Sequence, residues 1–427
     1  MAQIYEKGGV ILGIRQGRSK KEGTFNSEKT VFNVNTDKER PIDYSDESLE
    51  PDESPLNKVY LNLSKAFHIA EYIFLAATLV FIVTFVASNP KTISYRNFIA
   101  ILNEINAAKP ESDRYTRLSY STETPEKSVV FGSGIAVLSE DNIFMFSGTG
   151  RFIYSQLHGI EEPYIAAKGK YAVVYGLGTN EYKIYSSYNQ IHSGATEYPI
   201  YSCSVADDGS VVFIEYLPSG KTRVSCYNSS FDETGHIDIA GYAVDTDISR
   251  DGGIHVISLL SSDGDSAVIF KSYDMKNGIT VAEHRFNGVL PIDMCVLENG
   301  YTALVFNNGT VILNESLEIC ATASHKKPID VNFHGELTSI ATADELIVFD
   351  SSGSFLVRER LFDVPKAVCM SENYVFLLTD DRADRIGLSS EGGRDSMSVP
   401  HDSCLIAVLT DDHIVSFGKA GAAMIDY

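Results

Sequence analysis

The sequence predicts an all-β fold, an eight-bladed β-propeller with seven blades as the alternative, within a chain of 427 residues. Three observations predict it. From about residue 114 onwards, short β-rich runs alternate with Gly, Asp, Asn and Ser turns. Similar strands recur at spacings of roughly 35 to 48 residues, the length of a four-stranded propeller blade. The last unit lacks a fourth strand, and a spare strand precedes the first unit.

The repeat is clearest where a proline opens a unit, as in 199–203, 291–295, 328–331 and 365–369. The eight predicted first strands lie near Val129, Tyr164, Ile200, Val244, Ile292, Ile329, Ala367 and Leu405. We expect each first strand to be small and apolar, because it crowds the central channel. The second strand should be buried on both faces by neighbouring blades, and the fourth should be polar as the outer edge.

Closure of the ring is also predicted. Residues 402–427 supply only three strands, and the segment RYTRLSYS at 114–121 supplies a fourth. Pairing of these two ends would close the last blade. A pair of β-sandwiches is the alternative, but it lacks a reason for the constant period.

An apolar segment precedes the propeller. Residues 72–88 read YIFLAATLVFIVTFVAS and contain no charge. A helix of this length covers about 26 Å, the short end of a bilayer core. We therefore predict four parts: a disordered cytoplasmic tail (1–66), a transmembrane helix (67–89), a stalk helix with linker (90–113) and the propeller (114–427). A buried core helix and a cleaved signal peptide are the alternatives.

The orientation prediction depends on the basic residues. Those close to the span nearly balance, with Lys58 and Lys65 before it and Lys91 and Arg96 after it. The ten basic residues of the tail favour a cytoplasmic N-terminus and an extracellular propeller in the cell membrane. Residues 37–57 are rich in Asp, Glu, Ser and Pro, a composition typical of disorder.

The stalk prediction rests on helical spacing. Phe98, Ile101, Leu102 and Ile105 fall on one face of a helix over 94–108, and Pro110 would stop that helix. We expect this amphipathic helix to pack against the propeller.

The charge excludes one class of function. The net charge is -22, and most of it lies in residues 91–427, with 45 Asp/Glu against 25 Lys/Arg. A nucleic-acid binder needs a basic face. We therefore expect no nucleic-acid partner and poor affinity for anionic lipid.

Two segments carry a resemblance. SVADDGSVVFIEY (204–216) and DISRDGGIHVIS (247–258) resemble the S-x-D-G-x-x-x-x-F motif of WD40-like and TolB-type propeller repeats. With the tail, span and stalk, the chain is similar to a family of single-span Gram-positive bacterial membrane proteins with a propeller ectodomain. This resemblance implies blades and a membrane anchor, and no activity.

Catalytic and metal motifs are absent from the sequence. There is no Trp, which removes the Trp-ended motifs of quinoprotein dehydrogenases and sialidases and the Trp-Asp pair of true WD40 repeats. There is no G-x-S-x-G, H-x-x-x-H or C-x-x-C. The glycine-rich runs at 132–134 and 147–150 and the acidic run at 262–265 read as hairpin turns. We assign no catalytic, cofactor or metal residue, no cofactor, and no identified binding residue.

The cysteines bear on location. All six lie in the propeller, and Cys203, Cys295, Cys369 and Cys404 fall in first strands, where Cys acts as a small hydrophobe. Only Cys369 and Cys404 occupy neighbouring blades, and whether they pair is left open. Unpaired thiols would favour a reducing compartment, against the predicted orientation.

The predicted function is a membrane-anchored, non-catalytic binding or scaffold module for an extracellular protein, peptide or glycan. Tyrosines around the second unit, between Tyr164 and Tyr188, form either a contact surface or ordinary strand positions. A hydrolase or lyase with its site in the central channel is one alternative, which several channel carboxylates with shifted pKa would favour. A cytoplasm-facing scaffold is the other.

Overall fold

The computed structural model describes residues 55–88, 115–123, 125–132, 134–262, 265–274, 277, 279–389 and 393–427. One long helix and 32 strands occur in these residues. The predicted stalk helix at 94–108 and most of the predicted disordered tail lie outside them.

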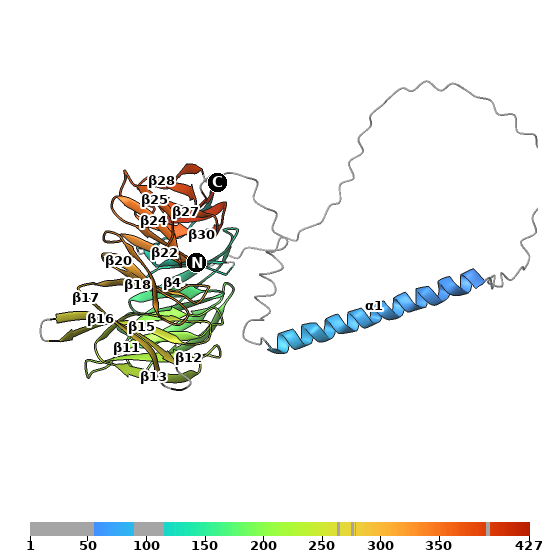
Figure 1. Ribbon diagram of the computed structural model, residues 1–427. Helices are drawn as coiled ribbons and strands as arrows, with labels where there is room; N and C mark the ends of the chain where they lie inside the picture. Colours follow the sequence, from blue (N-terminus) through green and yellow to red (C-terminus); the bar gives the residue numbers. More distant parts are fainter. Residues whose placement is uncertain are drawn as a thin grey trace, which may run out of the picture. The chain divides into compact units, whose positions relative to one another are not determined.

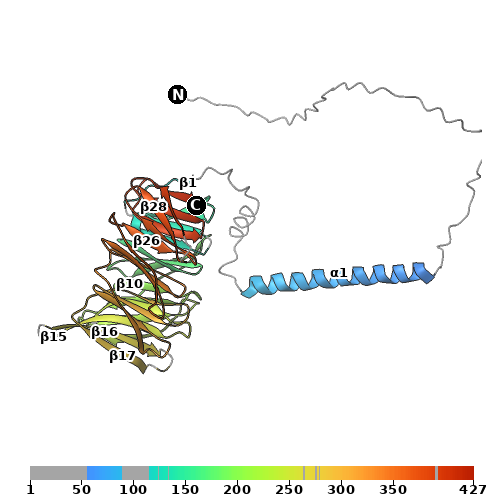
Figure 2. The same ribbon diagram turned by 45° about the horizontal axis from the view of Figure 1, so that its top comes forward.

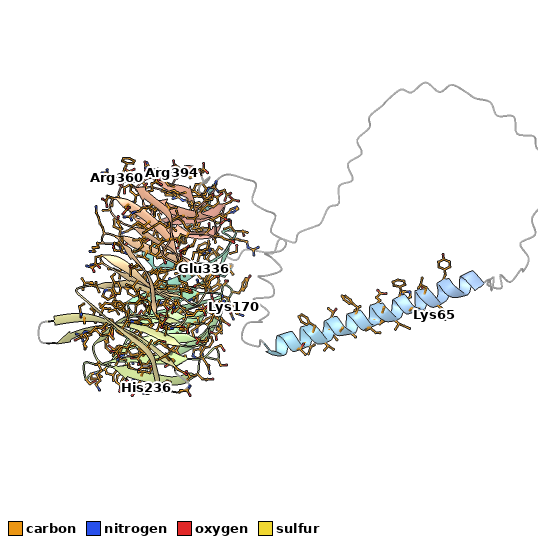
Figure 3. The ribbon with its side chains drawn as sticks, in the orientation of Figure 1. Lys65, Lys170, His236, Glu336, Arg360 and Arg394 are labelled. Atoms are coloured by element: carbon orange, nitrogen blue, oxygen red, sulfur yellow. The ribbon has the colours of Figure 1, made fainter. Side chains whose placement is uncertain are left out.

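The helix α1 runs from Pro55 to Ser88. It begins twelve residues before the expected start at 67, because Pro55 fits the first helical turn, where no N–H partner is needed. The segment Asn62–Phe81 is long and apolar enough to span a membrane. Its apolar side chains are exposed, Phe67 and Phe74 by 70% and 75%, and Figure 3 shows them projecting from the helix.

The strands form eight sheets of four antiparallel strands each, arranged as the blades of a propeller (Figure 1). This confirms the predicted eight blades. The first strands follow one another in ring order, and all neighbouring pairs except β18 and β22 are in close contact. They are β2 Ser128–Phe131, β6 Pro163–Lys168, β10 Ile200–Val205, β14 Tyr242–Ile248, β18 Pro291–Val296, β22 Asp330–His334, β26 Ala367–Met370 and β30 Leu405–Thr410. A short 3-10 helix, Pro125–Lys127, precedes β2.

The other three strands of each blade follow outward from the channel. The second strands are β3 Gly134–Leu138, β7 Tyr171–Gly176, β11 Val211–Tyr216, β15 Ile254–Ser262, β19 Thr302–Phe306, β23 Leu337–Ala341, β27 Tyr374–Leu378 and β31 His413–Gly418. The third strands are β4 Asn142–Ser147, β8 Glu181–Tyr185, β12 Thr222–Tyr227, β16 Asp265–Asp274, β20 Gly309–Leu313, β24 Glu345–Asp350, β28 Arg382–Gly387 and β32 Gly421–Asp426. The fourth strands are β5 Phe152–Leu157, β9 Gln190–Ala195, β13 Glu233–Ile239, β17 Ile279–Asn287, β21 Ile319–Ser324, β25 Phe355–Arg360, β29 Arg394–Ser398 and, in the last blade, β1 Tyr115–Leu118.

The ring closes as predicted. The strand β1 pairs antiparallel with β32, Tyr115 opposite Ile425 and Leu118 opposite Ala422. Leu118 is 1% exposed and packs in one core cluster with residues of the first blade and the last blade, including Phe146 and Phe417. The N-terminal strand therefore completes the blade that the C-terminus begins.

Burial follows the predicted order for the second and fourth strands. Second strands such as β3 and β19 are buried along their whole length. Fourth strands alternate between exposed and half-buried residues, as in β25. Figure 3 shows three labelled side chains of fourth strands, His236, Arg360 and Arg394, at the periphery of the propeller. The hydrophobic core is accordingly divided into clusters between blades.

The first strands differ from the prediction of small apolar residues. They carry Asp245, Asp247, Asp293, Asp330 and Asn332. Four of these side chains accept hydrogen bonds from backbone N–H groups of the next blade: Asp245 from Met294 (3.0 Å), Asp247 from Val296 (2.7 Å), Asp330 from Val368 (2.7 Å) and Asn332 from Met370 (3.1 Å). Adjacent first strands share no sheet ladder, so their N–H groups need side-chain acceptors.

The propeller has two faces. The turn face carries the turns between first and second strands and between third and fourth strands. The crossover face carries the connections from each fourth strand to the next first strand, and the turns between second and third strands. The blade β14–β17 has the longest strands, and in Figures 1 and 2 its β15–β16 hairpin extends beyond the ring. The strands on either side of 132–134, 147–150 and 262–265 pair antiparallel with each other, as the predicted hairpins require.

No disulfide joins any of the six cysteines, which all lie among the described residues, so Cys369 and Cys404 do not pair with each other. Cys203 and Cys295, both predicted to act as small hydrophobes in first strands, occupy different positions. Cys203 is buried in the core between blades, as is Met294, whereas Cys295 is the next residue along its strand and is only half-buried. The cause is the alternation of side chains along a strand, since a shift of one residue changes the face.

Candidate functional site

A cavity of about 520 Å³ opens on the turn face. Its walls come from the first-to-second turns of three consecutive blades, around residues 206–210, 248–254 and 296–300, with the end of β12 and Thr234 of β13. Lys168, at the end of β6, completes the lining. Four blades therefore contribute to one site.

The motif that resembles propeller repeats builds two of these walls. In the first turn, Asp208 accepts hydrogen bonds from the Ser210 N–H (2.8 Å) and hydroxyl (3.0 Å), and Gly209 has a φ of 91°. In the second turn, the Ser249 hydroxyl donates to Asp251 at 2.5 Å, and Gly252 has a φ of 84°. Asp closes the turn and Gly takes the positive φ, which explains the Asp-Gly pair.

The cavity has an apolar floor and a charged rim. The floor contains Val212, Ile248, Ile254, Val296 and Leu297, all at most 8% exposed. The rim carries the exposed side chains of Asp207, Asp208, Arg250 and Glu298. A ligand with an apolar group and adjacent charges would match both the apolar floor and the charged rim. A mostly apolar lining with a few polar groups is the usual pattern of a ligand pocket.

Lys168 joins the cavity to the channel. Its Nζ lies 3.4 Å from Asp247 Oδ1, and the Asp247 side chain is 10% exposed. Burial alone would lower the pKa of Lys168, but the Asp247 carboxylate raises it, and the net shift is upward. Lys168 is therefore a charged ammonium group at the cavity, and it is paired with Asp247.

Beside this pair lie two carboxyl groups in contact. Burial raises the pKa of Asp293 to about 6 and raises that of Asp245 well above its usual range. The charge of Asp293 raises the pKa of Asp245 further, whereas a hydrogen bond from Asp245 lowers that of Asp293. Burial also raises the pKa of Asp330. None of these three carboxyls lines the cavity on the turn face. Asp245 and Asp330 accept backbone N–H groups of the next blade and so link blades, whereas Asp293 accepts the N–H of Met294 in its own strand.

His255 is the buried histidine nearest this group. Burial lowers its pKa to about 4, although Asp247 and Asp251 oppose that shift. Its Nδ1 lies 3.3 Å from the Thr302 hydroxyl. A neutral imidazole bonded to a buried hydroxyl is a packing group between β15 and β19. Among the described residues no group of three or more His, Cys, Asp or Glu side chains is arranged to hold a metal ion.

No site residue was predicted from the sequence, and the cavity on the turn face was not foreseen. Its residues come from turns 40 or more positions apart, and only the Asp-Gly pairs were visible in advance. Five tyrosines of the second unit are strand residues, of which Tyr175, Tyr182 and Tyr185 are buried and Tyr164 and Tyr171 are half-buried. Tyr188 is half-buried and lies between β8 and β9. They do not form an exposed stacking surface.

Comparison with known proteins identifies the fold more than the function. Residues 111–392 match the model of a family described as a family of unknown function (DUF5711). No curated protein sequence matches the chain.

Three solved propellers are similar in structure. The C-terminal WD40 domain of Sif2 has 10% identity and a TM-score of 0.55, over 73% of this chain and 97% of that one. BamB from Moraxella catarrhalis has 10% identity and a TM-score of 0.51, over 73% and 100%. Sqt1 from Chaetomium thermophilum, solved with the N-terminus of ribosomal protein L10, has 13% identity and a TM-score of 0.50, over 69% and 94%. At these identities the likeness shows the propeller fold alone.

Proposed function

Because the chain belongs to the DUF5711 family, a family of unknown function, we propose from its own structure that it is a membrane-anchored, non-catalytic binding module. The cavity on the turn face carries this proposal. It binds an apolar side chain of a protein or peptide partner, or the apolar face of a glycan, while the charged rim orients the flanking polar groups.

The shape and chemistry of the cavity support binding. A volume of about 520 Å³ accommodates one or two large side chains or a sugar ring. The walls are hairpin turns held by their own Asp and Gly residues, so little ordering accompanies binding. Arg250 and Lys168 provide cations, and Asp207, Asp208 and Glu298 provide anions, so the rim selects a partner by charge.

Photo-crosslinking in cells tests this proposal. A photoreactive phenylalanine analogue at Arg250, on the rim, should give a discrete adduct, and the same analogue at Arg285, exposed on β17, should not. Ala206→Leu fills part of the cavity and should abolish the adduct. Ala195→Leu adds the same carbons at the exposed end of β9 and should leave it unchanged. Adducts that are the same for both probe positions, or that survive Ala206→Leu, would contradict the proposal.

The anchor is the second part of the proposal. The apolar, exposed helix α1 supports a single span, as in the Gram-positive membrane proteins that the sequence resembles. We assign residues 1–66 to a cytoplasmic tail, 67–89 to the span, 90–113 to a stalk and linker, and 114–427 to an extracellular propeller. The helical residues 55–66 then form its cytoplasmic extension.

Protease treatment of intact cells tests the orientation. A protease site inserted between 90 and 113 should release the propeller while the tail stays protected. If the site is cut only after lysis, the propeller faces the cytoplasm, and the absence of disulfides among its cysteines would fit that compartment.

An enzyme with its site in the central channel is the alternative. The carboxyls with raised pKa values, Asp245, Asp293 and Asp330, favour it. The bonds of Asp245 and Asp330 to backbone N–H groups of the next blade favour the linking role instead. Asp330→Asn decides between the two, since a catalytic role predicts loss of function in cells and a linking role predicts a change in stability alone.

A further inference from the structure

The crossover face carries a feature that repeats in three consecutive blades. The register of the first strand against the second shifts at Tyr201 in β10, at Val244 in β14 and at Ile292 in β18, which leaves each of these residues as the extra residue of a β-bulge. Ile329 stands at the same place in the next blade, immediately before Asp330. A β-bulge redirects a side chain out of the sheet, and bulges commonly do so beside functional sites.

The redirected side chains are apolar and exposed. Tyr201, Val244, Ile292 and Ile329 are 47%, 36%, 40% and 44% exposed. Tyr242 and Leu290, at the adjoining crossovers, are 57% and 54% exposed. The first strands β10, β14 and β18 contact one another in ring order, so Tyr201, Tyr242, Val244, Leu290 and Ile292 form one apolar arc around this mouth of the channel. Ile329 continues the arc at the same place in the next blade. Single exposed apolar residues are ordinary, whereas a contiguous arc marks an interaction surface.

Aromatic contacts hold part of the arc in place. The rings of Tyr201 and Tyr216 have centroids 4.0 Å apart, and those of Tyr216 and Tyr242 are 5.7 Å apart. Tyr216 is half-buried and comes from β11, so it fixes the two exposed tyrosines of neighbouring blades against each other. A preordered aromatic surface loses little side-chain entropy when a partner binds.

An acidic groove lies on the same face, one blade further along the ring. A cavity of about 540 Å³ is lined by Glu123, Glu140, Asp141, Glu161 and Glu162, with Lys127 as its basic residue. It sits at the connection between the blades β2–β5 and β6–β9, next to the blade where the arc begins. Five carboxylates against one ammonium group attract a cationic partner.

We propose that this face docks a segment of a partner polypeptide in which apolar side chains are followed by Lys or Arg. The apolar arc receives the apolar part and the acidic groove receives the basic part. This surface is separate from the cavity on the turn face, so the propeller can hold two partners at once. Like charge disfavours a second copy of this chain, whose net charge is -22, and also an anionic lipid surface.

A peptide selection tests the proposal. The full chain in phosphatidylcholine nanodiscs is presented to a phage library of random 12-residue peptides that has first been depleted on empty nanodiscs. The enriched peptides should combine apolar residues with Lys or Arg. Their affinity is then measured by biolayer interferometry on the wild type and on variants.

Three variants locate the binding. Val244→Ser with Ile292→Ser and Ile329→Ser, in the arc, should weaken binding at least tenfold. Asp141→Asn with Glu161→Gln and Glu162→Gln, in the groove, should weaken it several-fold and reduce its dependence on salt. Ile279→Ser with Val281→Ser changes exposed apolar residues of β17 and should leave affinity unchanged. If the circular dichroism spectrum shows that the triple arc variant is unfolded, the single variant Ile329→Ser takes its place in the affinity measurement.

Other outcomes overturn the proposal. The proposal is wrong if no peptide is enriched or if the enriched peptides are acidic. It is also wrong if the arc variants leave the affinity for the peptides unchanged. Peptides that lose affinity with Ala206→Leu but not with the arc variants would refute this proposal and leave the cavity on the turn face as the binding site. A dimer in mass photometry that the arc variants dissociate would identify a second copy as the occupant instead.

Discussion

Lys168 Nζ lies 3.4 Å from Asp247 Oδ1, and the pair joins β6 to β14, two blades that are not neighbours in the ring. The blade β10–β13 lies between them. The contact therefore spans the intervening blade, and Lys168 is the member of the pair that lines the cavity on the turn face. Asp247 also accepts the N–H groups of Ile248 and Val296 at 2.8 and 2.7 Å.

Asp247→Ala should destabilise the propeller more than Lys168→Met. The Asp247 change leaves two backbone N–H groups without their acceptor, at about 1–3 kcal/mol each. The Lys168 change removes a partly exposed charge pair. Lys271→Met is the matched control, because Lys271 is equally exposed but pairs with the half-exposed Glu283. Thermal midpoints by circular dichroism should fall in the order Lys271→Met, Lys168→Met, Asp247→Ala, and a smaller loss for Asp247→Ala than for Lys168→Met would contradict this reading.

The Asp245–Asp293 pair should make stability fall as pH rises. The pKa of Asp293 is about 6 in the folded protein, above the unfolded value of about 3.9, so the folded state binds more protons between these values. Its contribution is therefore favourable at low pH and is lost between about pH 4 and 6. Asp293→Asn should raise the thermal midpoint relative to the wild type increasingly from pH 4 to pH 7.

Asp384 provides the control of opposite sign. Burial alone would raise its pKa, but hydrogen bonds from Ser396 and Arg394, with Arg382 nearby, lower it overall. Its stabilising contribution is present above about pH 4 and is lost as pH falls further. Asp384→Asn should therefore be costly at pH 7 and less costly near pH 3. The same pH trend for both variants would show that the assignment of either group is wrong.

Closure of the ring should depend on Leu118. Leu118→Ala removes a buried side chain between the first and last blades and should cost about 2–5 kcal/mol. Arg117→Ala, exposed on the same strand, should have little effect. Denaturant unfolding followed by circular dichroism suits this chain, which has no Trp. Equal unfolding midpoints for the two variants would mean that β1 is not needed to close the last blade.

Alanine substitutions at two glycines in the turns around the cavity distinguish the cost of backbone strain from the cost of a steric clash. Gly209 and Gly252 have φ values of 91° and 84°, so an alanine at either position costs roughly 1–2 kcal/mol in backbone strain. A Cβ at Gly209 would also lie 2.7 Å from the Tyr171 ring, whereas a Cβ at Gly252 meets no atom within 4 Å. Gly209→Ala should therefore lower the thermal midpoint further than Gly252→Ala. Equal shifts would indicate that the Tyr171 ring moves aside freely.

The sequence by itself determined the blades, because each strand's burial is a local property. A second strand that is buried along its whole length must be mostly apolar, as in 302–306, and an outer fourth strand must alternate, as in 355–360. The unpaired strand at 115–118 and the incomplete last unit then required closure of the ring. The apolar, charge-free run at 72–88 was equally visible.

Only the tertiary structure decided the surfaces. Lys168, Asp208 and Arg250 line one cavity because curvature of the ring brings the ends of separate blades together, and no spacing in the sequence encodes that curvature. The first strands were predicted to be small and apolar, but they carry carboxylates that accept hydrogen bonds from the next blade. The N–H groups of one blade need acceptors on another blade, and a need of this kind is not a local property of the sequence. The bulges at Tyr201, Val244 and Ile292 are also invisible in advance, because a register shift exists only between paired strands.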